Sequence, residues 1–303
     1  MNKLSIVISA YNEAERIEKC LKSSMFANEI ILVDNQSIDD TVRIAKKYTS
    51  KIFSQRNDPF AIDLLKNTGF EKAENEWILS VDADEEISKE LSEEIENLLN
   101  EKPSEDGFWI PRKNYMFGKW IKENTGWYPD YQLRLFRKGK GKFLSKHVHG
   151  DIKLNGNSGK LKNHLIHNNY DSISQFIKKI MIYAPNEAED KLSKGYKFSH
   201  FDVIRLPIGE FQSWFFLRKG YRDGFHGLAL SLLMSFYHLI TALFIWEKQG
   251  FKEYAKGDFI KDVVLELKNS GKEISYWINK EQIENEKNPL KNTLRKIRNK
   301  IKA

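Results

Sequence analysis

The sequence predicts an α/β fold, in which a Rossmann-like, mostly parallel sheet is flanked by helices and followed by a helical C-terminal extension. Two observations carry this prediction. In residues 1–106, short β-branched runs alternate with segments whose apolar residues recur at helical spacing. From Asp171 onward the helical spacing continues without strand-like runs. Because strand–helix–strand repeats connect through right-handed crossovers, the alternating part is expected to form parallel βαβ units.

The first part of the chain contains four predicted strands and four predicted helices. The strands are Leu4–Ile8, Glu29–Val33, Lys51–Phe53 and Trp77–Val81. The helices are Glu15–Met25, Asp39–Tyr48, Phe60–Ala73 and Ser88–Asn100. Ser37 stands three residues before Asp40, which predicts a capping box at the start of the second helix. Ligands in such sheets bind at the carboxyl ends of the strands, so the polar residues that follow each strand are the candidate site.

Composition fits a globular enzyme and narrows its partners. Hydrophobic residues make up 41% of the 303 residues, which is enough to fill a core. The net charge of +7 suits nucleic acid, an anionic membrane surface or a phosphorylated substrate. The basic residues are scattered and match no recognition motif, so no nucleic-acid partner is predicted. The single cysteine, Cys20, excludes an intramolecular disulfide and a cysteine-based metal cluster. No secretory signal precedes the first strand, so a cytoplasmic location is expected.

Two segments of the helical part bear on membrane binding. Gly227–Trp246 has no charged residue and is long enough to span a bilayer. It also contains polar residues, and no second apolar span accompanies it, so a transmembrane, an interfacial and a core helix all stay open. Pro289–Ala303 has apolar residues on one helical face among lysines and arginines, which is typical of a helix on an anionic membrane surface or of a solvated tail.

Three carboxylates follow the fourth strand, in the run Asp82-Ala83-Asp84-Glu85. Neighbouring carboxylates repel one another unless a cation joins them. Oxygen ligands of this kind suit Mg²⁺ or Mn²⁺, which take one or two protein carboxylates and leave other positions to phosphate and water. Alternatively the acids sit at a solvated helix N-terminus, where negative charge is favoured.

Four motifs in this order resemble family 2 of the inverting glycosyltransferases, which have a GT-A fold. The resemblance covers roughly residues 3–100 and is more specific than a lone Asp-x-Asp. The motifs are Ala10-Tyr11-Asn12-Glu13, Val33-Asp34-Asn35-Gln36-Ser37-Ile38-Asp39-Asp40-Thr41, Lys66-Asn67-Thr68-Gly69 and Leu79-Ser80-Val81-Asp82-Ala83-Asp84-Glu85.

The resemblance implies a donor site for a nucleotide sugar, expected to be UDP-linked, and a divalent metal. Asp84 would bind the Mg²⁺ or Mn²⁺ ion that bridges the diphosphate, and Asp82 would touch the ribose or a metal-bound water. These two residues are therefore the candidate metal ligands. Further residues would line the site near the base and diphosphate: Ala10, Tyr11, Asn12, Glu13, Asp34 and Lys66.

The middle region is similar to a subgroup near the bacterial lipopolysaccharide core β-glucosyltransferases. The similarity lies in Tyr128–Arg137 and His147–Asp151. The Gln-x-x-Arg-Trp motif of processive synthases is absent, which favours transfer of a single sugar. An inverting transfer needs a general base for the acceptor hydroxyl. The candidates for that base are, in order of preference, Asp151, Asp130 and His149.

For several side chains of the middle region, the sequence allows two different roles. Arg134 is expected to bind a phosphate or an acceptor carboxylate through its planar fork, or to support its loop by a salt bridge. The histidines other than His149 are expected to be structural, because no third zinc ligand is evident beside them. Aromatic residues could supply a platform for the acceptor sugar or fill the core: Trp109, Tyr115, Phe117, Trp120, Trp127 and Tyr128.

These inferences predict three parts and one activity. Residues 1–106 are the nucleotide-sugar-binding part of the GT-A domain, residues 107–170 the acceptor-binding and catalytic part, and residues 171–303 a helical extension open to membrane association. The expected reaction moves one hexose to a hydroxyl of a cell-envelope glycan or glycolipid, such as lipopolysaccharide core, at the cytoplasmic face of the inner membrane. A polyprenyl-phosphate or other glycan-precursor transferase, a nucleotidyltransferase and a non-catalytic nucleotide-sugar-binding protein are the alternatives.

Overall fold

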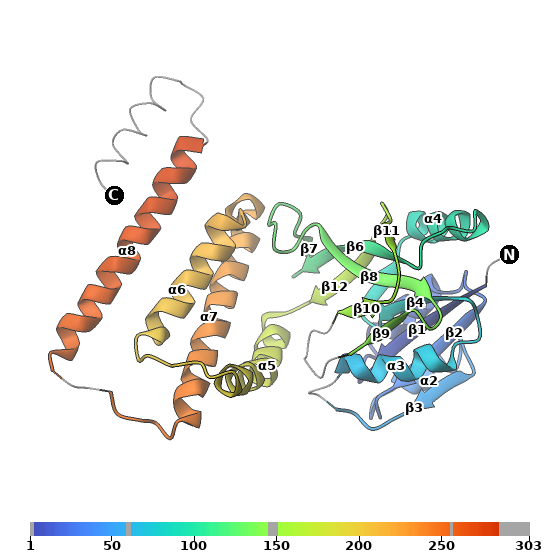
Figure 1. The fold of residues 1–303 in the computed structure, drawn as a ribbon, viewed down its shortest axis with the longest axis horizontal. Helices are drawn as coiled ribbons and strands as arrows, with labels where there is room; N and C mark the ends of the chain where they lie inside the picture. Colours follow the sequence, from blue (N-terminus) through green and yellow to red (C-terminus); the bar gives the residue numbers. More distant parts are fainter. Residues whose placement is uncertain (1–2, 59–61, 145–150, 255–256, 285–303) are drawn as a thin grey trace. The chain divides into compact units, whose positions relative to one another are not determined.

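The chain forms two compact units in a computed structural model that describes residues 3–58, 62–144, 151–254 and 257–284. The first unit comprises the chain up to residue 122 together with residues 127–171 (Figure 1). The second comprises residues 123–126 and the chain from residue 172 onward.

The first unit is built on one sheet of ten strands within the described residues. The path through the sheet is β3-β2-β1-β4-β8-β6-β12-β5, and β7 and β11 both pair with β6. The strands are β1 (Leu4–Ala10), β2 (Glu29–Asp34), β3 (Lys51–Ser54), β4 (Trp77–Asp82), β5 (Glu85–Ile87), β6 (Gly107–Met116), β7 (Lys119–Trp120), β8 (Asp130–Arg137), β11 (Ser158–Lys160) and β12 (Leu165–Tyr170). A separate antiparallel pair consists of β9 (Gly141–Phe143) and β10 (Ile152–Leu154).

The sheet confirms the predicted α/β class and extends it. Strands β1 to β4 pair in parallel, as the alternating pattern predicts. Strand β8 then runs antiparallel to both β4 and β6, so most strands of the middle region continue the same sheet, and β9 and β10 form the separate pair. The carboxyl ends of β1, β2 and β4 meet at one edge, which is where the predicted motifs lie.

All four predicted helices are present, within the ranges that the sequence pattern gives them. They are α1 (Ile17–Ser23), α2 (Thr41–Ala45), α3 (Ile62–Lys72) and α4 (Lys89–Asn100). Ser88 caps α4 by accepting a hydrogen bond from the Leu91 amide at 3.2 Å. The predicted capping box at α2 is wrong, because its N-cap residue, Asp40, makes no side-chain cap. Ser37 instead accepts a hydrogen bond from the backbone amide of Asn12 at 2.9 Å.

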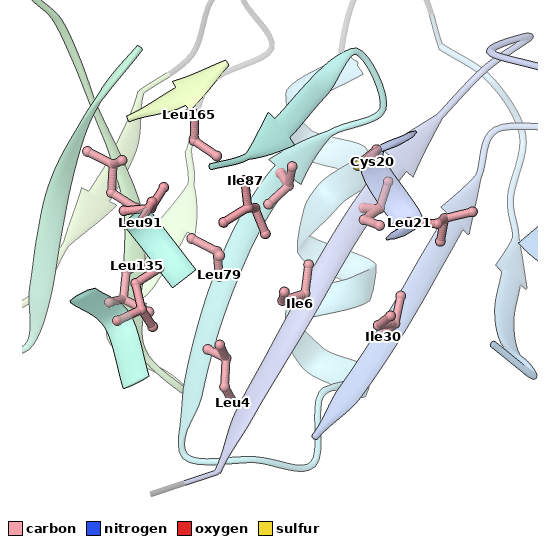
Figure 2. Close-up of a cluster of buried hydrophobic side chains, with 14 of the residues drawn as sticks. Leu4, Ile6, Cys20, Leu21, Ile30, Leu79, Ile87, Leu91, Leu135 and Leu165 are labelled. Carbon is pink, nitrogen blue, oxygen red and sulfur yellow. The ribbon is translucent and has the colours of Figure 1, made fainter. Parts of the chain in front are cut away.

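Both faces of the sheet are covered. Successive strand residues point to opposite faces, so Ile6 of β1 joins one core and Val7 joins the other. Figure 2 shows the first core, where side chains of the strands meet those of α1 and α4. Its labelled members include Leu4, Ile6, Cys20, Leu21, Leu79, Ile87 and Leu91. The second core holds Phe70 of α3 and Phe143 of β9. This burial on both faces explains why β1, β2 and β4 read as continuous apolar runs.

The second unit is helical, as predicted. Its elements are α5 (Ile173–Ser193), α6 (Asp202–Gln212), the single turns η1 (Ser213–Leu217) and η2 (Gly220–Asp223), α7 (Phe225–Lys248) and α8 (Phe259–Glu284) (Figure 1). Residues 123–126 are held in this unit by hydrogen bonds that their backbone amides donate. The Asp223 carboxylate accepts from the Asn124 amide at 2.8 Å, and the Arg218 carbonyl accepts from the Thr125 amide at 2.8 Å. Of the described helices, α7 is the one long and apolar enough to cross a membrane.

The packing of α3 on the sheet predicts that Gly69 cannot be replaced by a larger residue without loss of stability. A Cβ atom on Gly69 would lie 2.3 Å from Val7 and 2.8 Å from Val33, both on buried strands. Gly69→Ala is therefore expected to lower the free energy of unfolding by about 1–3 kcal/mol, as overpacked cores do. Gly209→Ala in α6 is the control, because its Cβ meets nothing within 4 Å and alanine favours a helix. Urea unfolding followed by circular dichroism compares the two, and equal stability of both variants would contradict the packing argument.

Candidate active site

Three carboxylates lie at the turn between β4 and β5. Asp82 is the last residue of β4, Asp84 lies in the turn, and Glu85 opens β5. The Asp82 amide donates a hydrogen bond to the Glu85 carboxylate at 2.9 Å, which tightens the turn. Like charges this close repel in a buried place, so each carboxylate needs its own compensating partner.

Asp82 is held by two cations. Lys66 Nζ and Arg134 lie on opposite oxygens of its carboxylate, each at 2.6 Å. Burial raises the pKa of Asp82, but the charges of Arg134 and Lys66 outweigh burial and hold that pKa well below its usual range. Lys66 also pairs with Asp63 at 2.8 Å, and the two acids keep the pKa of the buried lysine raised. Asp82 and Lys66 are therefore both charged in the folded protein.

Glu85 is fully buried and is compensated by two arginines. Arg134 lies 3.0 Å from its Oε1, and Arg112 lies 3.2 Å from the same atom. Arg112 continues to Asp130, whose carboxylate it contacts at 2.7 Å. The result is an alternating charge network of strands β4, β5, β6 and β8 with α3, which consists of Asp63, Lys66, Asp82, Arg134, Glu85, Arg112 and Asp130.

Asp84 faces a histidine from β12. His167 Nε2 lies 3.6 Å from the Asp84 carboxylate. The other ring nitrogen, Nδ1, lies 2.7 Å from Asn114 Oδ1. The amide nitrogen of Asn114 donates to the Trp127 carbonyl at 2.8 Å and to Asp130 at 3.0 Å, so its oxygen is the acceptor. His167 must then donate from Nδ1, and a neutral ring presents the lone pair of Nε2 to Asp84. Two acceptors that face each other require a proton or a cation between them.

A polar cavity of about 200 Å³ adjoins Asp84. Arg16 lies 3.9 Å from the Asp84 carboxylate and also pairs with Asp171. The Asp84 carbonyl accepts from the Asn168 amide at 3.1 Å, which fixes the turn against β12. The cavity is lined by Glu15, Arg16, Lys19, Asp84, Glu86, Asn168 and Asp171.

The loops after β1 and β2 are bonded to each other. Asn12 adopts a left-handed backbone (φ 55°), and its side chain accepts from the Ile38 amide at 2.9 Å. The Glu13 amide donates to Thr41 Oγ1 at 2.8 Å. Asp34 is buried and accepts from the Ser37 amide at 3.2 Å. These bonds order the edge of the sheet where the first two motifs lie.

The family assignment follows from the chain segment that contains these elements. Residues 5–153 match the family model described as Glycosyl transferase family 2. This chain belongs to glycosyl transferase family 2. Its sheet is the GT-A fold, mostly parallel and flanked by helices, which confirms the sequence-based expectation.

Two relatives are similar over most of the chain. An uncharacterized glycosyltransferase of Rickettsia typhi is 29% identical over 249 residues, which cover 78% of this chain and 84% of that protein. The lipopolysaccharide core biosynthesis glycosyltransferase LpsC of Rhizobium meliloti is 27% identical over 259 residues, which cover 82% of this chain and 94% of LpsC. Among solved structures, S. aureus TarS 1–349 in complex with UDP-GlcNAc is 14% identical and covers 84% of this chain and 93% of that chain. Its TM-score of 0.44 is too low to compare the sites.

The structure of this family 2 enzyme brings most of the predicted site residues to one edge of the sheet. The residues at that edge are Ala10, Tyr11, Asn12, Glu13, Asp34, Lys66, Asp82, Asp84, Asp130 and Arg134. Asp151 is exposed immediately before β10, and among the described residues no ion pair joins it to the charge network. His149 and the Pro289–Ala303 segment lie outside the described residues.

Sequence reasoning missed three residues that organise the site: Arg112, Asn114 and His167. His167 was expected to be structural, whereas it faces Asp84. A signal for it existed in the sequence, because strand alternation puts residue 167 in phase with the buried Leu165. Arg112 and Asn114 alternate in the same way along β6, but nothing local identifies Asp130 as their partner. The expected supporting salt bridge of Arg134 is present, to Asp82 and Glu85.

The charge network predicts a strong and pH-dependent effect of Asp82→Asn. Removal of the carboxylate leaves Lys66 and Arg134 under-compensated, so the free energy of unfolding at pH 7 is expected to fall by about 3–5 kcal/mol. The folded-state pKa of Asp82 is lowered, so its contribution is present above about pH 4 and is lost as the pH falls through that pKa. The difference in the free energy of unfolding between wild type and Asp82→Asn is therefore expected to become smaller at acid pH.

A matched control for this prediction is Asp40→Asn. Asp40 pairs with Arg43 at 2.6 Å, but both side chains are exposed. Exposed pairs contribute little, so this variant should unfold at nearly the wild-type urea concentration. Urea titrations at pH 7 and at about pH 2 measure both variants. An Asp82→Asn protein as stable as Asp40→Asn at pH 7 would contradict the account.

Proposed function

We propose that this chain transfers a single hexose from a UDP-linked sugar to a hydroxyl of a cell-envelope glycan, with inversion at the anomeric carbon and with Mg²⁺ or Mn²⁺ bound. The observation that carries the proposal is the different state of the two aspartates of the Asp82-Ala83-Asp84 motif. Lys66 and Arg134 each contact the Asp82 carboxylate at 2.6 Å, whereas the Asp84 carboxylate lies 3.6 Å from His167 Nε2 and 3.9 Å from Arg16. The relative LpsC, named for lipopolysaccharide core biosynthesis, supports a lipopolysaccharide-type acceptor.

The residues around Asp84 fit a divalent cation. The carboxylate and His167 Nε2 are both electron-pair donors when the ring is neutral, and Asn114 holds the ring in that tautomer. Asp84 and His167 would hold the ion, and phosphate oxygens and water would complete its shell. Within the described residues no three His, Cys, Asp or Glu side chains cluster for a metal. When bound, the ion neutralises charge on the departing nucleoside diphosphate.

The protein's own side chains would hold the nucleotide. Asp34 lies buried at the end of β2, where it would accept a hydrogen bond from the base. Tyr11 is 44% exposed at the end of β1 and is available to cover the base. Lys66 and Arg134 place two fixed positive charges beside Asp82, toward the ribose and diphosphate. The bonded loops after β1 and β2 would keep this arrangement ordered before the donor arrives.

We assign the general base to Asp151. Asp130, the second candidate, accepts hydrogen bonds from Arg112, Asn114 and Gln132. Burial raises the pKa of Asp130, but these partners outweigh burial and lower it, which makes its carboxylate a weak base. Asp151 is exposed and keeps its lone pairs available to water and to an incoming acceptor hydroxyl. The acceptor would be a glycolipid at the cytoplasmic face of the inner membrane.

Variants of the metal site provide one test of this function. Asp84→Asn and His167→Ala are expected to weaken activation by Mn²⁺ at least about 10-fold, because each removes a ligand of the ion. His164→Ala is the control, since His164 contacts Tyr128 at 3.0 Å and not Asp84. UDP release from a panel of UDP-sugars, measured against Mn²⁺ concentration and with lipopolysaccharide core acceptor, reports the effect. If the activity of Asp84→Asn depended on Mn²⁺ concentration as wild-type activity does, metal binding at Asp84 would be contradicted.

Variants of the base candidates provide a second test. Asp151→Asn is expected to lower kcat about 10²–10⁴-fold and to leave the donor KM within a few-fold, since a base acts only in the chemical step. Asp130→Asn should instead lower stability, because it leaves Arg112 with one acidic partner. Full activity of Asp151→Asn would contradict the assignment. The same assay on His149→Gln would then examine the remaining candidate.

A further inference from the structure

Helix α7 has two opposite faces of different character. Four large apolar side chains are exposed on it, and Phe225 is 80% exposed. These residues are Phe225, Leu232, Phe236 and Leu243. An α-helix turns through about 100° per residue, so spacings of 7, 4 and 7 residues put all four on one line along the helix. We call these four residues the apolar line.

The face opposite the apolar line is packed against the rest of the helical unit and mixes small, polar and apolar residues. Its buried members are Gly227, Leu230, Ser231, Thr241, Ala242 and Ile245. Ser235 beside this face donates to the Pro207 carbonyl of α6 at 2.7 Å. Tyr237 donates to Glu187 of α5. The helix is therefore attached to α5 and α6 through its packed face, and its apolar line lies on the opposite side.

These contacts decide against a membrane-spanning α7. The helix is 24 residues long, and only 28% of its apolar window is buried in the protein, so it is not an ordinary core helix. Its packed face holds His238 at 3.8 Å from Glu210 and, at its end, Lys248 at 2.5 Å from Glu189. A spanning helix would carry α5 and α6 with these charges into the hydrocarbon, which is costly. The apolar line is the most exposed apolar part of the helix, which fits a helix that lies in the plane of the interface.

The basic residues on either side of α7 in the sequence favour anionic lipid. Arg218, Lys219 and Arg222 precede the helix, and Lys248 and Lys252 are at its end. Seven lysines and arginines and one glutamate follow residue 285, so this last stretch of sequence carries six of the chain's seven net positive charges. Cations at both ends of an exposed apolar face, followed by a basic stretch, complement an anionic membrane surface.

We propose that the apolar line of α7 inserts into the interface of an anionic bilayer, with the helix axis parallel to the membrane plane. The inference goes beyond the proposed function, because it depends on neither the donor, the metal nor the base. It also names the surface and the orientation by which the helical unit meets lipid. The large apolar side chains enter the acyl boundary, and the flanking cations stay with the headgroups.

Vesicle sedimentation of the full chain tests the surface. Wild type is expected to bind phosphatidylcholine vesicles with 30% phosphatidylglycerol at least about 10-fold better than pure phosphatidylcholine vesicles. Leu232→Glu with Phe236→Glu should lower binding to the anionic vesicles at least about 10-fold. The matched control is Asn97→Glu with Asn100→Glu, which adds the same charge at exposed positions of α4 and should keep wild-type binding. Circular dichroism must show wild-type helix content in both double variants.

Three results would overturn the proposal. Wild type could fail to bind anionic vesicles, or the α7 double variant could bind them as tightly as wild type does. Light scattering could instead show a wild-type dimer that the α7 variant dissociates without any vesicle binding, and the apolar line would then be a subunit contact. UDP release is measured on the same variants, so failure of the membrane proposal remains distinguishable from failure of the proposed activity.

Spin-label depth measurements test the orientation. Nitroxides are attached to cysteines at positions 232, 236 and 243 in a Cys20→Ala background, which is needed because Cys20 is the single native cysteine. An in-plane helix predicts the same shallow depth at all three positions. Depths that progress from one leaflet toward the other along the helix would show a spanning α7 and overturn the proposal.

Discussion

The site depends on one arginine that bridges two carboxylates. Arg134 of β8 contacts both Asp82 and Glu85, and it thereby joins β4, the last of the parallel strands β1 to β4, to the strands that follow. A buried carboxylate without a partner is costly, so the turn from β4 to β5 could not place three acids together without this cation. Lys66 and Arg112 extend the same compensation to either side. The network makes the edge of the sheet rigid and leaves Asp84 as the acid turned toward the polar cavity.

That division of roles links the fold to the proposed chemistry. Asp130 anchors Asn114, Asn114 fixes the ring of His167, and the ring presents its second nitrogen to Asp84. Strands β6, β8 and β12 therefore supply both the charges that stabilise the turn and the histidine that faces it. If Asp84 and His167 bind a metal as proposed, the pair would be ordered before a donor arrives, which would lower the entropic cost of binding.

Local sequence patterns predicted the parts of the fold that local physics determines. Buried strands such as Trp77–Val81 are continuous apolar runs, and the motifs after them marked the edge where the site lies. Partners brought together by strand pairing were not predictable in this way, because Asn114 meets His167 only through the register of β6 with β12. The capping-box prediction for Ser37 was wrong for a similar reason. Its hydroxyl bonds the neighbouring loop at Asn12, a contact 25 residues away, in place of its own helix.

Calorimetric titration of UDP into the protein tests the central claim most directly. The account predicts that UDP binds in the presence of Mn²⁺, that EDTA weakens this binding strongly, and that Asp84→Ala abolishes the difference between the two conditions. Binding of UDP that is equally tight with Mn²⁺ and with EDTA would contradict a metal at Asp84. If neither UDP nor GDP, dTDP or CMP gave heat under any condition, the edge of the sheet would not be a nucleotide-sugar site.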